Sequence, residues 1–456
     1  MKHEYFAVRL NNRLLLFLFA TILPFVSQAQ TQRKITLAEA INMGITASNQ
    51  LKISQGKLDY AQAKHDETFD LQYPSAKLTA GYSRLSDVPE FQVLFPGATE
   101  PQTLFPVYLN SYQNRISINE VIFAGFRVKT AKEAANKTLG AAQYDLKKDR
   151  NDVGLNIITA YFNLYKVQQA VGIIDQNLEL INQRLKDVQN FENNGMATHN
   201  DELRVELQQS NTQLVRIDAE TILKVANYNF NLLIGLPGDV DIVLDTTAIF
   251  TMRNVNAQDA FITNALQNRP EMQSLLLKNQ AAQDNLKIAQ NGFWPTLSAG
   301  ANFFYASPNI RYIPPTNEFK ATWDLGLTLN WDITNVFTNK HVIAENQALL
   351  DQADAARQQL SDGIKSEVYQ NYLAYSQSLE KLEVLNKTVT IAEENLSVTN
   401  SRYHNNVAVI SDVTDAQTQQ IQSQINYVIA EADAQIAYYK LLVSSGNWDP
   451  QPRDNK

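Results

Sequence analysis

Two stretches of the chain contain no proline and are too long to fit inside a compact domain. They run from Phe126 to Phe191 and from Phe337 to Tyr403, and both are rich in Ala, Gln, Leu, Glu and Lys, which favour helices. A helix of about 66 residues is about 100 Å long at a rise of about 1.5 Å per residue. The sequence therefore predicts an elongated molecule built around two very long helices.

Each long stretch ends at a short polar segment, after which a second helical stretch returns. The segments are NNGMATHND at 193–201 and HNNVAVISD at 404–412. Asn200 and Ser411 are the expected N-caps of the returning helices, because their side chains can accept hydrogen bonds from the first turn. We therefore expect two helical hairpins with their tips at about 193–201 and 404–412.

The chain also matches itself at an offset of 211 residues. Asn119 corresponds to Asn330, and Tyr161 corresponds to Tyr372. Two copies at so long an offset indicate a duplicated domain and not a solenoid. The predicted parts are a first structural repeat at 34–236, a linker or equatorial segment at 237–254, a second structural repeat at 255–446 and a C-terminal tail at 447–456.

Each repeat has the same predicted internal order. A helical stretch comes first, at 37–71 or 257–293, and an aromatic–proline pair ends it. Two strands follow, separated by a proline-rich loop whose composition opposes both helix and sheet. The four strands are expected at about 76–85, 113–123, 296–306 and 322–333.

The last strand, TWDLGLTLNWDI, has the clearest pattern of the four. Every second residue is apolar, and the residues predicted to face lipid are Trp323, Leu325, Leu327, Leu329 and Trp331. A run of about ten alternating residues with aromatic residues at both ends is typical of an outer-membrane β-barrel strand. The alternative is an amphipathic strand packed on a soluble core. If the strands do lie in lipid, several chains must contribute to one barrel, because the smallest known barrels have eight strands.

The N-terminal segment is predicted to direct export. Three basic residues precede the apolar run 14–26, and Ser27-Gln28-Ala29 completes a secretory signal peptide at 1–29. The run is shorter than the about 20 residues of a transmembrane helix. We expect no membrane-spanning helix in the remainder. The chain has no cysteine, which excludes disulfides and thiolate metal sites, and its net charge of −8 gives no support for nucleic-acid binding.

These features together resemble the TolC family of outer-membrane efflux channels. The second tip is similar to the family pattern of an aromatic residue, a short turn and I-x-D-V-x-x-A, in Tyr403, Ile410, Asp412, Val413 and Ala416. The first tip looks like its counterpart in Phe191, Gly195, Ala197 and Asp201. The resemblance covers nearly the whole chain after the signal peptide.

The resemblance implies an α+β membrane protein with a long α-helical coiled-coil barrel. Three chains with four strands each would share a 12-stranded barrel in the outer membrane of a Gram-negative cell. The implied function is that of a passive exit duct of a tripartite efflux or type I secretion system. The implied partners are two further copies of the chain, a periplasmic adaptor protein, an inner-membrane efflux pump or ABC exporter, and outer-membrane lipid, with no cofactor and no nucleic acid.

The resemblance also implies a gate at the periplasmic mouth. The implied gate residues are Asp412, Asp415, Tyr403 and Asp201. Three copies of an aspartate around a narrow axis should bind a cation or have raised pKa values, because like charges disfavour full ionisation. The alternative is that these carboxylates are solvated and stabilised by a helix N-terminus.

The tips are the implied contact with the adaptor, through Gly195, Met196, Ala197, Asn406, Val407 and Ala408. The chain departs from the family at one of these positions. Ala408 occupies the place of an arginine that ties the mouth shut in other members, and Arg402 is one possible substitute. Asn406 replaces a glycine, and asparagine tolerates the left-handed conformation better than most residues do.

No enzyme motif accompanies these features. The sequence has no glycine-rich phosphate loop and no G-x-S-x-G, and its histidines show no metal-binding spacing. His199 and His404 lie near the two tips, and we interpret them as exposed turn residues; the alternative is a metal or pH role. A secreted coiled-coil structural or adhesion protein without a membrane barrel is the alternative function. A diffusion porin conflicts with the four strands and the long helices.

Overall fold

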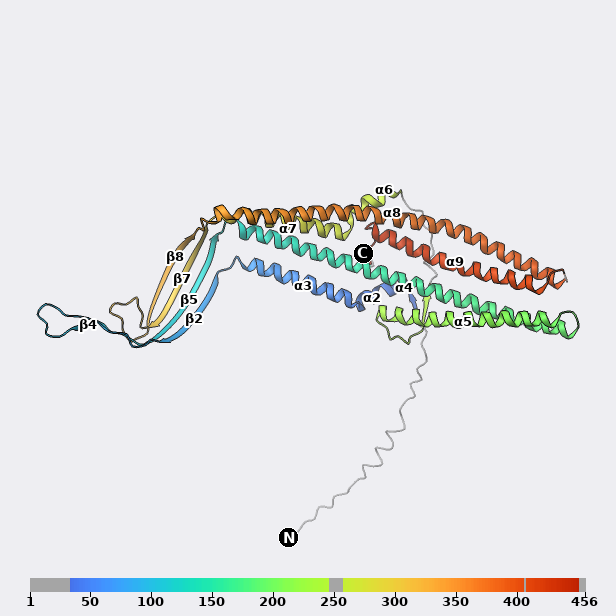
Figure 1. Cartoon of the computed structure of the whole chain (residues 1–456), viewed down its shortest axis with the longest axis horizontal. Helices are drawn as coiled ribbons and strands as arrows, with labels where there is room; N and C mark the ends of the chain where they lie inside the picture. Colours follow the sequence, from blue (N-terminus) through green and yellow to red (C-terminus); the bar gives the residue numbers. More distant parts are fainter. Residues whose placement is uncertain (1–32, 246–256, 406, 451–456) are drawn as a thin grey trace, which may run out of the picture.

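The chain forms a long rod with a β-sheet at one end and two helical hairpins at the other (Figure 1). The computed structural model describes residues 33–245, 257–405 and 407–450. The predicted signal peptide, residues 246–254 of the predicted linker, Asn406 and the last six residues of the tail lie outside the described residues.

Four long helices account for most of the rod. They are α4 (Arg127–Asn193), α5 (His199–Ile234), α8 (Asn335–His404) and α9 (Ile410–Ser444). Helices α4 and α5 form the first hairpin, and α8 and α9 form the second. Within the described parts of the chain, no helix is both long enough and apolar enough to cross a membrane.

Each repeat opens with two short helices where the sequence predicted one. They are α2 (Leu37–Ala47) and α3 (Asn49–Asp70) in the first repeat and α6 (Gln258–Asn268) and α7 (Pro270–Gln290) in the second. The breaks fall at Ser48 and Arg269, which are both extended. Ser48 caps α3 by accepting a hydrogen bond from the Leu51 N–H at 3.3 Å. Pro270 disfavours a helical conformation at Arg269 and can itself begin a helix.

The sheet contains one pair of strands from each repeat. Its strands are β2 (Ser75–Arg84), β5 (Asn110–Phe123), β7 (Thr296–Ser307) and β8 (Lys320–Asn330). The order is β2-β5-β7-β8, and every neighbouring pair is antiparallel. Strand β2 follows α3, β5 leads into α4, β7 follows α7 through the short 3-10 helix Asn291–Phe293, and β8 leads into α8. Strands β2 and β8 are the edges, each with a single neighbour in the described chain.

The strand register places apolar side chains on one face. Leu325 lies opposite Ala301, and Ala301 lies opposite Ile118. Near the end of β5, a bulge between Val121 and Phe123 changes the register. Ile122 is therefore the unpaired residue of the bulge, and Phe123 lies opposite Leu297.

The first proline-rich loop contains a short hairpin that the sequence did not predict. Its strands are β3 (Phe91–Val93) and β4 (Gln102–Phe105). The prolines of this loop flank the two strands and do not interrupt them, so the ladder loses no donor within either strand.

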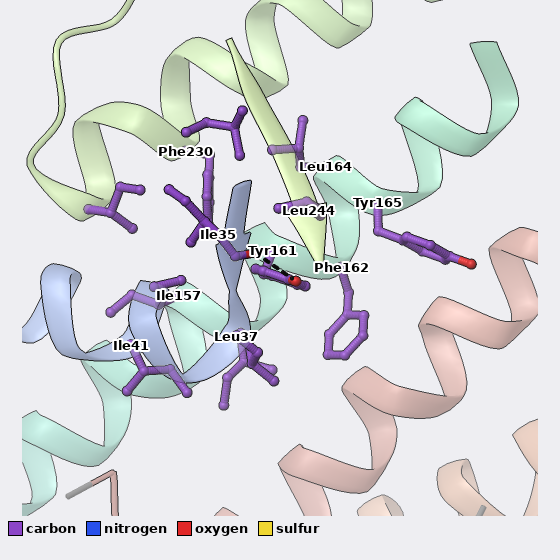
Figure 2. Packing of buried hydrophobic residues seen from close by; sticks show 14 of the residues in the cluster. Ile35, Leu37, Ile41, Ile157, Tyr161, Phe162, Leu164, Tyr165, Phe230 and Leu244 are labelled. Carbon is purple, nitrogen blue, oxygen red and sulfur yellow. Dashed lines mark hydrogen bonds between the residues drawn. The ribbon is translucent and has the colours of Figure 1, made fainter. Parts of the chain in front are cut away.

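The main hydrophobic core lies at mid-length, where the linker meets both hairpins. Strand β1 (Arg33–Thr36) pairs in parallel with β6 (Ile242–Asp245), and their apolar side chains pack against α2, α4 and α5 (Figure 2). The Tyr161 hydroxyl lies 3.2 Å from the Ile35 carbonyl oxygen and 2.9 Å from that of Asp245, so one buried side chain contacts both strands. Trp448 in the tail packs on the same core, and a side chain at Gly154 would collide with its ring.

Helix α4 binds the short helices of both repeats through equivalent contacts. Ser54 on α3 donates a hydrogen bond to Asp149 at 2.6 Å, and Ser274 on α7 donates one to Asp145 at 2.5 Å. Both serines are buried, and both aspartates lie on α4, one helical turn apart. The duplication is therefore visible in side-chain contacts as well as in the order of the elements.

The helices form a row in the same order as the strands. Beside the sheet the contacts run α3–α4–α7–α8, and toward the tips they run α5–α4–α9–α8. The strands that continue these helices lie in the order β2-β5-β7-β8. Both the helical layer and the sheet therefore end at an open side on each flank.

Candidate functional site

The first tip is closed by a glycine turn and a capping box. Gly195 has φ +74°, a left-handed conformation that glycine adopts without a steric cost. Thr198 is the N-cap of α5, and the Asp201 carboxylate accepts hydrogen bonds from the Thr198 N–H at 3.0 Å and from its hydroxyl at 2.8 Å. The expectation that Asn200 caps this helix is wrong, because Thr198 can form the reciprocal pair with Asp201 and Asn200 lies already inside the helix.

The helix that returns from the second tip begins with an equivalent but weaker cap. Val409 is the N-cap of α9, and the Asp412 carboxylate accepts a hydrogen bond from its N–H at 3.4 Å. Ser411 lies inside the helix, so the expectation that it is the cap is also wrong. Asp201 and Asp412 therefore hold equivalent positions in the two hairpins, three residues after each N-cap.

Asp412 and Asp415 are both exposed in the single chain. They alternate with Val413 and Ala416, which are buried against Leu396 and Tyr403. Because this apolar packing fixes the rotation of α9, it determines the direction in which both carboxylates point. The structure thus brings together the predicted pair on one solvent-facing side of the helix.

Tyr403 joins the second hairpin to the first. Its ring packs beside the cluster of Ile181, Val188, Val205 and Ile410, which comes from α4, α5 and α9. Burial raises the pKa of Tyr403, the nearby Asp201 carboxylate adds to the rise, and Arg184 opposes it. Tyr403 and Asp201 are thus near one another, although no hydrogen bond joins them among the described residues.

Sequence reasoning missed Arg184, which connects three helices just above the tips. The guanidinium on α4 donates to the Gln417 amide oxygen on α9 and to the Asn400 amide oxygen on α8, the latter at 3.1 Å. Gln417 is fully buried and donates in turn to Asn177 on α4. Burial lowers the pKa of Arg184, yet an arginine remains charged in a protein. The group is therefore a buried, charge-assisted connection between the hairpins.

The sequence does contain a signal for this connection. Ile174, Ile181 and Val188 recur every seven residues, as the core positions of a coiled coil do. Asn177 and Arg184 recur with the same spacing, three residues after two of them. A polar residue in a coiled-coil seam specifies partner and register at some cost in stability.

The alternative cation, Arg402, lies on the exposed side of α8. Of the predicted tip residues, Met196 and Val407 are exposed and apolar, and Ala408 is half-buried. Ala197 packs against the apolar cluster below the tip. Asn406 lies outside the described residues. The tips thus present a small apolar surface next to the capped helix starts.

The predicted lipid-facing residues are exposed at the opposite end of the rod. Trp323 and Leu325 are 70% and 71% exposed, and Leu327 and Leu329 are similar. Trp331 lies one residue beyond the end of β8, and its Nε1 donates to the Phe293 carbonyl oxygen at 3.0 Å. An apolar strand face this exposed requires an apolar environment or a partner.

Long helical hairpins that continue into an open-edged sheet with an exposed apolar face define the outer-membrane efflux channel class. The profile of the outer membrane efflux protein family matches residues 28–236 and 261–447. The chain belongs to this family. It is an outer-membrane efflux protein. Its family and structural relatives are channel proteins and not enzymes.

Individual relatives agree with this assignment. The outer membrane efflux protein BepC of Brucella suis is 23% identical over 340 residues, which are 73% of this chain and 71% of BepC. The structure of VceC from Vibrio cholerae is 15% identical with a TM-score of 0.74, and the match covers 90% of this chain and 96% of VceC. The open state of MtrE from Neisseria gonorrhoeae is 15% identical with a TM-score of 0.71, and the match covers 91% of both chains. The predicted fold class is therefore confirmed, and the secreted adhesion protein is set aside.

The Arg184 connection leads to a testable expectation. Arg184→Ala removes two hydrogen bonds from a charged donor, each worth about 1.5–3 kcal/mol, so local opening should become at least about tenfold more frequent. Amide hydrogen exchange in residues 396–417 should accelerate accordingly. Arg402→Ala is the matched control and should leave exchange unchanged. Equal exchange in the two variants would show that Arg184 does not hold the hairpins together.

Proposed function

We propose that three copies of this chain assemble into one channel, the exit duct of a tripartite efflux or type I secretion system. The observation that carries the proposal is the common order of strands and helices. In the sheet the open ends are β2 and β8, and in the helical layer they are α3 and α5 on one flank and α8 on the other. A single rotation that places α8 beside α3 and α5 of the next copy also places β8 beside β2.

The sheet supplies the energetic reason for assembly. Every unpaired backbone N–H or C=O in the hydrocarbon core costs several kcal/mol, so an open edge is not tolerated there. The exposed row that includes Leu325 and Leu327 favours lipid on one face. Three chains with four strands each give a closed barrel of 12 strands, well above the minimum of eight.

The outermost helices carry apolar stripes that no part of the described chain covers. All members of these stripes are exposed, at the spacings of 7 and 11 residues that keep side chains on one side of a helix. They are Ile53 and Tyr60 on α3, Leu207, Leu214, Val225 and Leu232 on α5, and Val384, Ile391 and Val398 on α8. Neighbouring copies would bury these stripes against one another in a coiled-coil tube.

The resulting tube would conduct passively. The exposed apolar tips, with Met196 and Val407, are the proposed contact with a periplasmic adaptor protein, and an inner-membrane efflux pump or ABC exporter would supply the energy. The polar row Lys77–Ser117–Asn302–Asp324 crosses the whole sheet on the face opposite the apolar residues and would line an aqueous lumen.

The periplasmic gate would lie where the three second hairpins meet. Asp412 and Asp415 would form rings of carboxylates around the axis, with Tyr403 and Asp201 at the contact between hairpins. Arg184 would hold the closed arrangement in place of the arginine that Ala408 replaces. This role is supported by its hydrogen bonds to Gln417 on α9 and Asn400 on α8, which tie the second hairpin to α4.

The carboxylate rings predict cation block of the channel. Asp412→Asn with Asp415→Asn should raise the divalent-cation concentration that halves single-channel current in planar bilayers by at least about tenfold. The reason is that charges about 4 Å from a bound ion contribute about 4 kcal/mol at an effective dielectric constant of 20. Asparagine at 412 can still accept the capping hydrogen bond, and Asp218→Asn on α5 is the control. An unchanged blocking concentration would exclude the two aspartates from the gate.

The lipid-facing row predicts a face-specific assembly defect. Leu327→Arg should reduce insertion, because a lipid-facing arginine near the bilayer midplane costs about 2–4 kcal/mol. Thr328→Arg, one residue further along, points to the proposed lumen and should insert normally. The measurement is the amount of each variant in detergent-extracted outer membranes. If Thr328→Arg were the more damaging change, the assignment of the two faces would be wrong.

A further inference from the structure

Three metal-ligand side chains converge at the first tip, at the end of the rod farthest from the sheet (Figure 1). They are Glu192 in the last turn of α4 and His199 and Glu202 in the first turns of α5. One ligand atom from each lies within 4.8 Å of the other two. The His199 Nδ1 is 3.2 Å from Glu192 Oε1 and 3.3 Å from Glu202 Oε2.

We propose that Glu192, His199 and Glu202 bind a divalent transition-metal ion of the Zn²⁺ class at the tip of the first hairpin. Zn²⁺ takes histidine nitrogen and carboxylate oxygen at about 2.0–2.2 Å, which places neighbouring ligands of a tetrahedral ion about 3.4 Å apart. Both distances from His199 are close to this spacing. Imidazole favours Zn²⁺ over Mg²⁺ and Ca²⁺, which prefer sites made entirely of oxygen. The exposure of His199 leaves a fourth position open to water.

The negative charges of the cluster also favour binding of a cation. Glu192 lies at the C-terminal end of α4, where the helix dipole disfavours an anion, and the last turn contains no basic residue. Neither glutamate has a lysine or arginine partner among the residues that the structure describes.

A neighbouring side chain orients one of the ligands. Gln189 donates a hydrogen bond from Nε2 to Glu202 Oε1 at 2.9 Å, which leaves Oε2 directed at His199. Metal-binding carboxylates are commonly held in this way by outer hydrogen-bond partners. Glu202 is only 17% exposed, so its position is fixed by packing as well.

The second hairpin provides an internal comparison. Counted from the N-caps Thr198 and Val409, His199 and Glu202 correspond to Ile410 and Val413, which are 2% and 0% exposed. The second repeat uses these two positions for apolar packing below the tip. The first repeat has a histidine and a glutamate there, although both copies retain the capping aspartate. Packing and capping therefore do not account for the ligand set of the first tip.

The proposal is tested by Zn²⁺ competition against a chromogenic chelator, with the full chain purified in detergent without a polyhistidine tag. We expect one Zn²⁺ per chain. His199→Ala and Glu202→Gln should each weaken binding at least about tenfold, because loss even of an outer partner costs about 10–100-fold. Glu192→Gln gives a third variant whose substitution lies on a different helix.

His404→Ala is the matched control, since His404 is an exposed tip histidine of the other hairpin. It should bind Zn²⁺ as the unmodified chain does. Circular dichroism of each variant should show unchanged helix content. Co²⁺ as a probe should give the strong visible absorption of a four-coordinate site, and this absorption should disappear in His199→Ala. The proposal would be overturned if Zn²⁺ binding were equal in all variants, or if His404→Ala weakened it as much as His199→Ala does. This result does not depend on whether the chain assembles as a trimer.

Discussion

The unpaired hydrogen-bonding groups along β2 and β8 are the constraint on which the rest of the structure depends. Within the described chain each of these strands has one neighbour, so one side of each backbone has no partner in the sheet. Water could satisfy these groups, but the apolar face that includes Leu325 and Leu327 makes lipid the favourable environment. If strands of further copies complete the sheet, the edge N–H and C=O groups are paired and the apolar face can lie in lipid.

The helical layer follows from the same constraint. Each strand continues into or out of a helix, so the order of the strands sets the order of the helices. Helix α4 is central in this arrangement, because it binds α3 and α7 through Asp149 and Asp145 and the second hairpin through the buried group around Arg184. An assembly that closes the sheet would therefore also close the tube and would hold the tips at a fixed distance from the barrel.

The sequence predicts the long-range architecture well and the local details less well. The long helices and the strands could be predicted because a proline-free run and a period-two alternation extend over many residues. The helix breaks at Ser48 and Arg269, the bulge at Ile122 and the caps at Thr198 and Val409 each depend on one or two residues in a particular conformation. The alternation of apolar and polar residues does not predict such positions.

The polar groups near the tips were the least predictable. Arg184 contacts Asn400 and Gln417, which are more than 200 residues away in the sequence, so only the packing of α4 against α8 and α9 brings them together. His199 was interpreted as an exposed turn residue, because Glu202 becomes its neighbour only within α5 and Glu192 only once the hairpin brings the end of α4 beside it. In both groups the contacts depend on how the helices pack or cap, which a residue pattern does not show.

The number of chains in the channel is the most direct test of this account. Because the chain has no cysteine, one cysteine can be placed in β2 and one in β8 without background. Lys77 and Asp324, at the two ends of one polar row, are starting positions that can be moved along each strand in steps of two residues. Oxidation in isolated outer membranes should give a covalent ladder that ends at three chains at some pair of positions. A ladder that ends at any other number, or the absence of cross-linking at every pair, would contradict the shared barrel.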